Sequence, residues 1–138
     1  MKSAEAKRWL LMIAVILCLV PLGFGTKIYS GVAQEWVRHH AGGLLYVTFW
    51  CLVARLVFHR AHRERIIVVV FAVTCLIEVL QLWQPDFLVP VRRNLIGGQL
   101  IGEDFDWWDF PHYVLGALLG GVGINALTRE SEGVDEVS

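Results

Sequence analysis

The stretch "IIVVVFAVTCLIEVLQLW", residues 66–83, is the part of the sequence that decides the fold class. Apart from Thr74, Glu78 and Gln81 it is entirely apolar. A membrane-spanning helix needs about 20 apolar residues to cross roughly 30 Å of hydrocarbon, with about 17 as a lower limit. The stretch is therefore long enough for a short transmembrane helix, and it raises the question of why a glutamate lies inside it.

Three further apolar blocks of similar length are visible in the sequence, at residues 9–24, 43–58 and 110–127. The 138-residue chain is 56% hydrophobic and only 18% charged, and its mean hydropathy is +0.55. A soluble domain of this size would need more polar surface to cover its core. We therefore predict an all-α fold, an integral membrane bundle of four transmembrane helices in one domain (residues 1–127), with a disordered cytoplasmic tail at residues 128–138.

Lysine and arginine are more frequent in one set of flanking segments than in the other. The two termini and the second loop hold seven of these residues and the other two loops hold four: Lys2, Lys7, Arg8, Arg60, Arg63, Arg65 and Arg129 against Lys27, Arg38, Arg92 and Arg93. Because cytoplasmic segments carry the excess of positive charge, we predict that both termini are cytoplasmic and that loops 25–42 and 84–109 are external.

The first apolar block has a second interpretation, as a secretory signal peptide. It has a basic start and an apolar centre, and Gly31 and Ala33 could form a weak cleavage site. The apolar run continues past Pro21 to Phe24, which favours a transmembrane helix over a signal peptide. We expect Pro21 to kink or end this helix.

Glu78 shares one helix face with Thr74 and Gln81, which lie four residues before it and three residues after it. An ionised carboxylate that faces lipid is costly, so this face is expected to point into the bundle or into a cavity. One interpretation is a protonated or paired glutamate that holds helices together. The other is a site for a headgroup, a proton or catalysis, and we favour it because ionisable residues inside membrane spans usually have functions.

The partner of Glu78 is expected on the external side of the bundle. Arg55 lies nearer the cytoplasmic end of its helix, where its side chain can reach the lipid headgroups. We therefore expect the partner of Glu78 to be Lys27, Arg92 or Arg93. Two aromatic residues of the second helix lie at a depth suitable for lining the same cavity: Tyr46 and Trp50.

The second external loop begins with Arg92 and Arg93, whose guanidinium groups match the oxygens of a phosphate. Such a phosphate would belong to a lipid headgroup or to a lipid-linked precursor, whereas ordinary anchoring at the membrane surface is the alternative role of the arginines. The next segment, "NLIGGQLIG", is apolar but too short to cross the membrane. Its glycines are expected to break a regular helix, and it could dip into the membrane as a re-entrant segment.

The end of this loop is acidic. Asp104, Asp106 and Asp109 could bind a divalent cation through oxygen ligands, but their spacing matches no established metal-binding loop. We interpret them as a solvated turn in which Asp109 caps the last helix, with Pro111 in its first turn. His39 and His40 have no cysteine at ligand spacing and are interpreted as solvated loop residues. We expect no metal and no cofactor.

Small residues in the last helix predict close packing. Gly116 and Gly120 are four residues apart, a spacing that lets two helix backbones approach each other. They could serve packing within the bundle or contact between copies in a homo-oligomer.

The segments "IEVLQLWQP", "RRN" and "GEDFDWWDFPHYVLGALLG" resemble the VanZ-like membrane proteins of bacteria. The chain is more closely similar to the short domain of unknown function 2809 group beside them, and the similarity covers nearly all of residues 20–123. The shared features are an acid-x-x-Gln on the third helix, an arginine in the next loop and an Asp-x-x-x-Tyr-x-x-Gly at the last helix. They fall here on Glu78, Gln81, Arg92 or Arg93, Asp109, Tyr113 and Gly116. The resemblance implies a bacterial inner-membrane location and a link to resistance toward teicoplanin-type glycopeptides.

Three functions are compatible with these patterns. The first is binding of an envelope lipid or cell-wall precursor headgroup in an externally open polar site formed by Glu78, Gln81, Arg92, Arg93, Asp109 and Tyr113. The second is a small intramembrane enzyme that modifies an envelope lipid, with Glu78 or Asp109 as general base. The third is a structural subunit of a membrane complex. The sequence has no signature of the common soluble enzymes, and its net charge of -1 gives no sign of nucleic-acid binding.

Overall fold

The structure is a computed structural model that describes residues 2–83, 85–101 and 105–129 of the chain. Among these residues, four helices are long and apolar enough to cross a membrane, the second of them counted from Gln34. The long helices are α1 (Lys2–Ile28), α3 (Gly42–Val57), α4 (Arg63–Leu82) and α7 (Asp109–Arg129). Shorter helical segments connect them: α2 (Gln34–Trp36), the π-helical turn η1 (Val37–Ala41), the 3-10 turn η2 (Asp86–Leu88), α5 (Val89–Arg93) and α6 (Leu95–Ile101). The predicted fold class is confirmed: the chain is an all-helical, multi-pass membrane protein.

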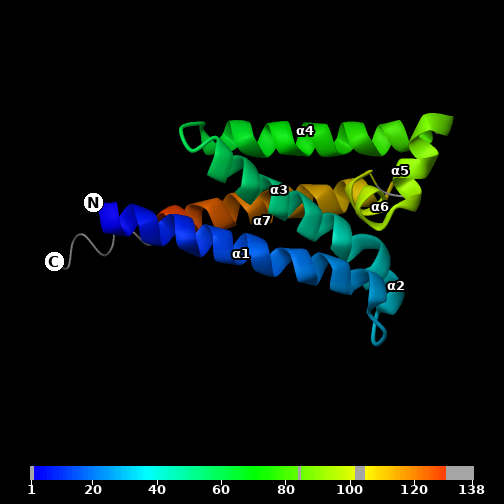
Figure 1. Ribbon diagram of the computed structural model, residues 1–138, viewed down its shortest axis with the longest axis horizontal. Helices are drawn as coiled ribbons and strands as arrows, with labels where there is room; N and C mark the ends of the chain where they lie inside the picture. Colours follow the sequence, from blue (N-terminus) through cyan, green and yellow to red (C-terminus); the bar gives the residue numbers. More distant parts are fainter. Residues whose placement is uncertain (1, 84, 102–104, 130–138) are drawn as a thin grey trace.

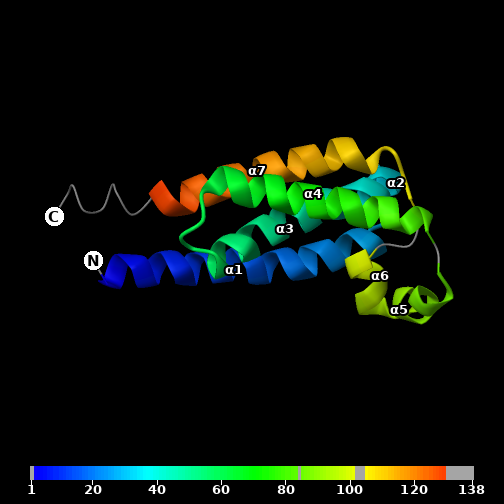
Figure 2. The same ribbon diagram turned by 90° about the horizontal axis from the view of Figure 1, so that it is seen from above.

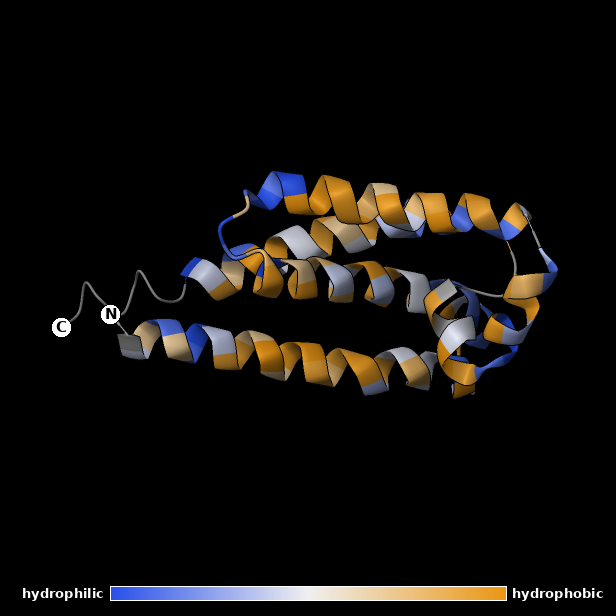
Figure 3. Ribbon diagram, turned by 45° about the horizontal axis from the view of Figure 1, so that its top comes forward, coloured by the Kyte–Doolittle hydropathy of each residue, from blue (hydrophilic) through white to orange (hydrophobic). Residues whose placement is uncertain are grey.

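The four long helices lie side by side along one direction (Figures 1 and 2). The start of α1, the end of α7 and the loop between α3 and α4 lie at one end of the bundle, and α2, α5 and α6 lie at the other. Apolar residues dominate the length of the helices, and hydrophilic residues gather at their ends (Figure 3). Both described termini therefore lie at the same end, as an even number of spans requires. The prediction that this end is cytoplasmic stays a prediction.

The predicted spans lie on the observed helices, but the ends of two helices differ from the prediction. Pro21 lies inside α1 and does not end it, since the helix continues to Ile28. An internal proline removes one backbone hydrogen bond, and the apolar flanks favour the rest of the helical ladder. At the other terminus Thr128 and Arg129 belong to α7, so they are not part of the tail. The rest of the predicted tail, residues 130–138, lies outside the described residues.

The expectation that glycines break the segment after Arg93 is wrong, because Gly97 and Gly98 lie inside α6. Gly97 is buried, and a side chain there would collide with the backbone carbonyl of Val91. The absence of a Cβ lets α6 fold back against α5, which outweighs the low helix propensity of glycine. That α6 dips into the membrane stays a prediction.

Glycines of α7 bring that helix close to α3. A Cβ at Gly116 would lie 2.6 Å from the Leu44 carbonyl oxygen, and one at Gly120 would lie 2.6 Å from the Cβ of Cys51. Helices in lipid associate largely through such close van der Waals packing. Packing within the bundle, the first of the two predicted roles of these glycines, is thus observed, whereas a homo-oligomer stays a prediction. The core around this contact is formed by Val47, Cys51, Leu52, Ala117 and Ile124.

Candidate functional site

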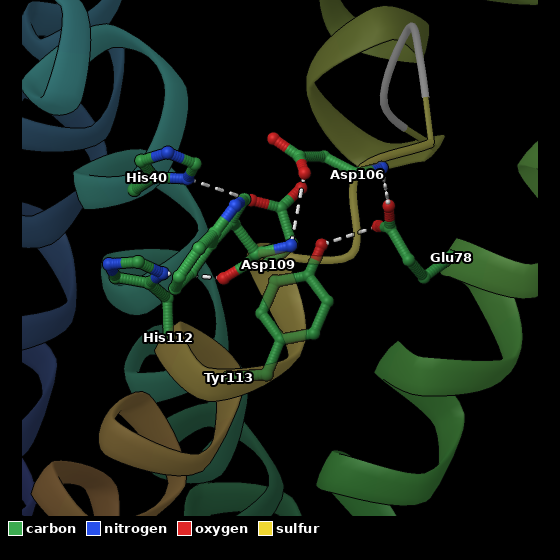
Figure 4. Close-up of polar contacts among 7 residues, drawn as sticks. His40, Glu78, Asp106, Asp109, His112 and Tyr113 are labelled. Atoms are coloured by element: carbon green, nitrogen blue, oxygen red, sulfur yellow. Dashed lines mark hydrogen bonds and ion pairs between the residues drawn. The ribbon is translucent and has the colours of Figure 1, made fainter.

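Glu78 lies on the face of α4 that points into the bundle, and its side chain is fully buried at 0% exposure. One carboxylate oxygen, Oε2, accepts the hydroxyl proton of Tyr113 on α7 at 2.6 Å. The other, Oε1, accepts the backbone N–H of Asp106 at 2.9 Å (Figure 4). Thr74 and Gln81 are buried on the same helix. The predicted inward orientation of this polar face is confirmed, and it explains how a glutamate is accommodated in an apolar span.

The turn that precedes α7 is organised by backbone hydrogen bonds around Asp106. Its N–H is bound by Glu78, its side-chain Oδ1 accepts the N–H of Trp108 at 3.0 Å, and its carbonyl accepts the N–H of Asp109 at 3.1 Å. These hydrogen bonds fix the conformation of the backbone where it leads into α7. A buried side chain of α4 thus fixes the position of an acidic residue in the loop.

Two histidines from different parts of the chain lie beside this turn. His40, in η1, points its Nδ1 at the Oδ1 of Asp109 across 3.3 Å, and the two side chains are only 17% and 15% exposed. The ring of His112 stacks on that of His40, with centroids 4.6 Å apart and planes 8° from parallel. The Nδ1 of His112 lies 2.7 Å from the carbonyl oxygen of Trp108, which can only accept, so this nitrogen carries a proton. We call His40, Glu78, Asp106, Asp109, His112 and Tyr113 the polar cluster (Figure 4).

The expected cationic partners of Glu78 are wrong. In the described part of the chain, Lys27, Arg92 and Arg93 form no ion pair with it, and its partners are a phenol and a backbone amide. Arg55 donates to the carbonyl of Ala61 at 2.8 Å, in the loop at the far end of the bundle. The separation in depth of Arg55 from Glu78 is therefore confirmed.

The expected cap of the last helix is wrong as well. Asp109 is the first residue of α7, and its carboxylate faces His40 rather than the backbone amides of the first turn. The side chain that accepts a backbone amide before α7 is that of Asp106. Asp104 lies outside the described residues.

The predicted site residues fall into two groups. Glu78, Asp109 and Tyr113 belong to the polar cluster, and Gln81 is buried on α4 one turn beyond Glu78. Arg92 and Arg93 lie on α5, which is at the same end of the bundle in Figure 1. Arg92 is half-buried, and its Nε and Nη2 have no hydrogen-bond acceptor among the described residues, whereas Arg93 is exposed.

Tyr46 and Trp50 line apolar cavities in the described part of the chain. These cavities have volumes of about 190 and 350 Å³, and Glu78 lines neither. The smaller cavity lies between α1, α3 and α6, and the larger lies between α3 and α4. The hydroxyl of Tyr46 donates to the carbonyl of Leu100 at 2.8 Å, which ties α3 to α6.

Three members of the polar cluster were not predicted as site residues: His40, Asp106 and His112. The two histidines were visible in the sequence, but their approach depends on how η1 packs against α7. A π-helical turn within a helix is rare and frequently lies at a functional site, and no propensity rule predicts it. One signal in the sequence could have identified these residues: two histidines and several acids lie at the same predicted end of the membrane bundle.

Residues 32–117 match the model of a family described as "Protein of unknown function (DUF2809)". The match runs from the segment before α2 into α7 and includes every residue of the polar cluster. No solved structure matches the chain.

Proposed function

The chain belongs to the DUF2809 family of proteins of unknown function, and we propose that it binds the headgroup of an envelope lipid or lipid-linked cell-wall precursor. The observation that carries the proposal is the fully buried Glu78, bound to Tyr113 and to the turn before α7. Burying a carboxylate in a membrane span is costly, and this one holds the turn that carries Asp106, which supports a binding role for the polar cluster.

The chemistry of the residues at this end of the bundle suits a zwitterionic or polyhydroxylated headgroup. The carboxylates of Asp106 and Asp109 and the imidazole of His40 accept hydrogen bonds from amine or hydroxyl groups. Arg92 offers two donor nitrogens, Nε and Nη2, with no acceptor among the described residues, and a guanidinium binds phosphate oxygens in a bidentate manner. The proposed ligand therefore places its amine or hydroxyl groups at the polar cluster and its phosphate toward α5.

The apolar cavities support a ligand with hydrocarbon chains. The smaller one is lined by α1, α3 and α6, and α6 lies at the same end of the bundle as the polar cluster. Its lining is almost entirely apolar and includes Val20, Phe24, Leu45, Ile96 and Leu100. A hydrocarbon chain that moves from water into this cavity gains about 25 cal/mol per Å² of apolar surface buried. A chain that moves into it from the bilayer gains only the difference between its packing in the cavity and its contact with lipid.

The cellular setting is part of the same proposal. The excess of lysine and arginine at the end that carries both described termini supports a cytoplasmic position for that end and an external position for the polar cluster. The sequence resemblance to VanZ-like proteins supports a bacterial inner membrane and a role connected with glycopeptide resistance.

The proposal is tested by mass spectrometry of lipids that co-purify with the protein. The double variant Arg92→Gln/Arg93→Gln and the variant Asp109→Asn should each lose the bound lipid species. The matched control is Arg60→Gln/Arg65→Gln, which removes two exposed arginines at the opposite end. An identical lipid profile in wild type, site variants and control would contradict headgroup binding.

An enzymatic function is a second candidate, favoured by the pair of His40 and Asp109. A carboxylate that orients an imidazole is a common arrangement for general-base catalysis, in which the imidazole takes a proton from a hydroxyl group or a water. Here the general base is His40, rather than Glu78 or Asp109 as the sequence suggested. Asp109 orients the imidazole, and Glu78 positions the turn. Turnover of labelled envelope lipids should then be lost in His40→Gln and kept in His39→Gln, and no turnover by the wild type would contradict it.

A further inference from the structure

The geometry points to a divalent metal site formed by His40, Asp106 and Asp109, for a cation of the Zn²⁺ or Mn²⁺ type. One ligand atom from each of these residues lies within 4.8 Å of the other two. The ligands come from two segments far apart in the sequence, the π-helical turn η1 and the turn at the start of α7 (Figure 4). The site departs from the sequence-based expectation of no metal, and it does not depend on the proposed headgroup binding.

The spacing of His40 and Asp109 fits two ligands of one cation. Their atoms Nδ1 and Oδ1 are 3.3 Å apart, whereas a charge-assisted N–H···O hydrogen bond is typically about 2.7–2.9 Å. Two ligands bound to Zn²⁺ at about 2.1 Å with a tetrahedral angle between them are separated by about 3.4 Å. The observed distance is therefore long for a charge-assisted hydrogen bond and close to the edge of a coordination tetrahedron.

The surrounding contacts hold the ligands in place before any cation arrives. Asp106 is fixed through its N–H by the buried Glu78, and one of its carboxylate oxygens is oriented by the N–H of Trp108. The ring of His40 is held by stacking on His112. Hydrogen bonds and packing of this kind around ligands typically raise metal affinity, since less order has to be created on binding. The same contacts that organise the turn thus serve as the support of a metal site.

The ligand set selects the class of metal. One imidazole nitrogen and two carboxylate oxygens suit Zn²⁺ or Mn²⁺, whereas Cu⁺ prefers sulfur ligands and Ca²⁺ prefers oxygen ligands throughout. Three protein ligands leave at least one coordination position open for water or another oxygen ligand. The partial exposure of His40 and Asp109 gives the ion a route to the site.

The test is titration of the purified full-length protein in detergent with Zn²⁺ and, separately, with Mn²⁺, after contaminating metal has been removed with a chelating resin. The variants His40→Asn and Asp109→Asn each remove one ligand. The controls His39→Asn and Asp86→Asn remove exposed groups of the same chemistry from the same end. We expect one ion per chain, with an affinity that falls at least about tenfold in the ligand variants and stays unchanged in the controls.

A second measurement uses the wild type alone and so does not depend on variants that fold. The electron paramagnetic resonance spectrum of bound Mn²⁺ should show coupling to one imidazole nitrogen, and the coupling should change when histidine is labelled with ¹⁵N. The site is refuted if the wild type binds neither metal or if bound Mn²⁺ lacks nitrogen coupling. Equal losses of affinity in the ligand and control variants would refute it too. Because no lipid enters these experiments, they are separate from the test of headgroup binding.

Discussion

Two parts of α7 hold the helix in the bundle by different means: its start, residues 109–115, which we call the polar half, and the remainder from Gly116 onward, which we call the glycine half. In the polar half Asp109 contacts His40 and Tyr113 contacts Glu78 through polar atoms. In the glycine half the missing side chains let the backbone of α7 pack directly on α3. The polar half thus depends on two individual polar contacts, and the glycine half distributes its packing over several small residues.

The two parts of α7 should differ in their sensitivity to substitution. In a membrane, water gives no hydrophobic driving force between helices, so packing and buried hydrogen bonds carry the association. A buried donor that loses its acceptor costs more than the bond itself contributes, because neither lipid nor protein replaces the acceptor. Loss of the acceptor Glu78 should therefore do more damage than a single change at the glycine half, because it leaves two buried donors without a partner.

The largest expected effect is that of Glu78→Leu. It leaves the hydroxyl of Tyr113 and the N–H of Asp106 without their acceptor, at about 1–3 kcal/mol for each buried donor. The free energy of unfolding, measured by denaturation in mixed micelles, should fall accordingly, and Glu78→Gln should cost less because its amide oxygen still accepts one bond. The matched control is Glu64→Leu on the exposed end of the same helix. Equal losses in Glu78→Leu and Glu64→Leu would contradict the role of Glu78 as the anchor.

The glycine half is tested by alanine substitutions that differ only in what the new Cβ meets. Gly116→Ala presses on the Leu44 carbonyl oxygen, and Gly120→Ala on the Cβ of Cys51, so neither neighbour can rotate away. Overpacking of this kind typically costs about 1–3 kcal/mol. Gly121→Ala should cost less, because it meets only the flexible end of Ile67, at 2.8 Å.

The matched control for the glycine series is Gly25→Ala in α1, where nothing lies within 4 Å of the new Cβ. This change should raise stability by about 0.5–1 kcal/mol, because alanine loses less backbone entropy in a helix than glycine does. The four melting temperatures in detergent should therefore fall in the order Gly25, Gly121, then Gly120 and Gly116. A Gly116→Ala variant as stable as Gly25→Ala would show that the close approach of α7 to α3 is not required.

The fold was predictable because the membrane signal is local: a sufficiently long apolar run indicates a transmembrane helix, whichever helices pack against it. The helix ends were less predictable, since the rules for isolated helices predict a kink or an end at Pro21 and a break at Gly97. Pro21 costs its long apolar helix only one hydrogen bond, and Gly97 allows a tertiary contact with Val91. Tertiary context outweighed local propensity at both positions.

The site was half predictable for a similar reason. The inward direction of Glu78 follows from the cost of a carboxylate in lipid, which any single helix reveals. We predicted its partners from opposite charge, but the observed partners are the hydroxyl of Tyr113 and the backbone amide of Asp106. Tyr113 reaches Glu78 because of how α7 packs beside α4, and a backbone amide cannot be recognised from residue types. His40 reaches Asp109 across 69 positions of sequence, and only the folded chain shows that approach.

A smaller effect is expected for Tyr113→Phe. The change removes one hydrogen bond to Glu78 but leaves the N–H of Asp106 bound, so the loss should be about 1 kcal/mol. A double-mutant cycle with Glu78→Leu should give a coupling energy of similar size, since each single variant deletes the hydrogen bond that the two residues share. The control Tyr29→Phe removes an exposed hydroxyl that donates over 3.3 Å to Val32 and should have almost no effect. Additive losses in the cycle would mean that the bond contributes nothing.

The smallest effect is expected at the opposite end of the bundle, in Arg63→Gln. This residue donates to Glu64 at 3.1 Å, a shorter contact than the one between His40 and Asp109. Both partners are exposed, so water and salt screen their attraction and the side chains lose entropy in forming it. The melting temperature should therefore match that of the wild type within error at low and high salt. A loss of stability as large as that of Tyr113→Phe would mean that contact distance determines how much each interaction stabilises the protein. We expect instead that burial determines it, so that the exposed pair contributes least.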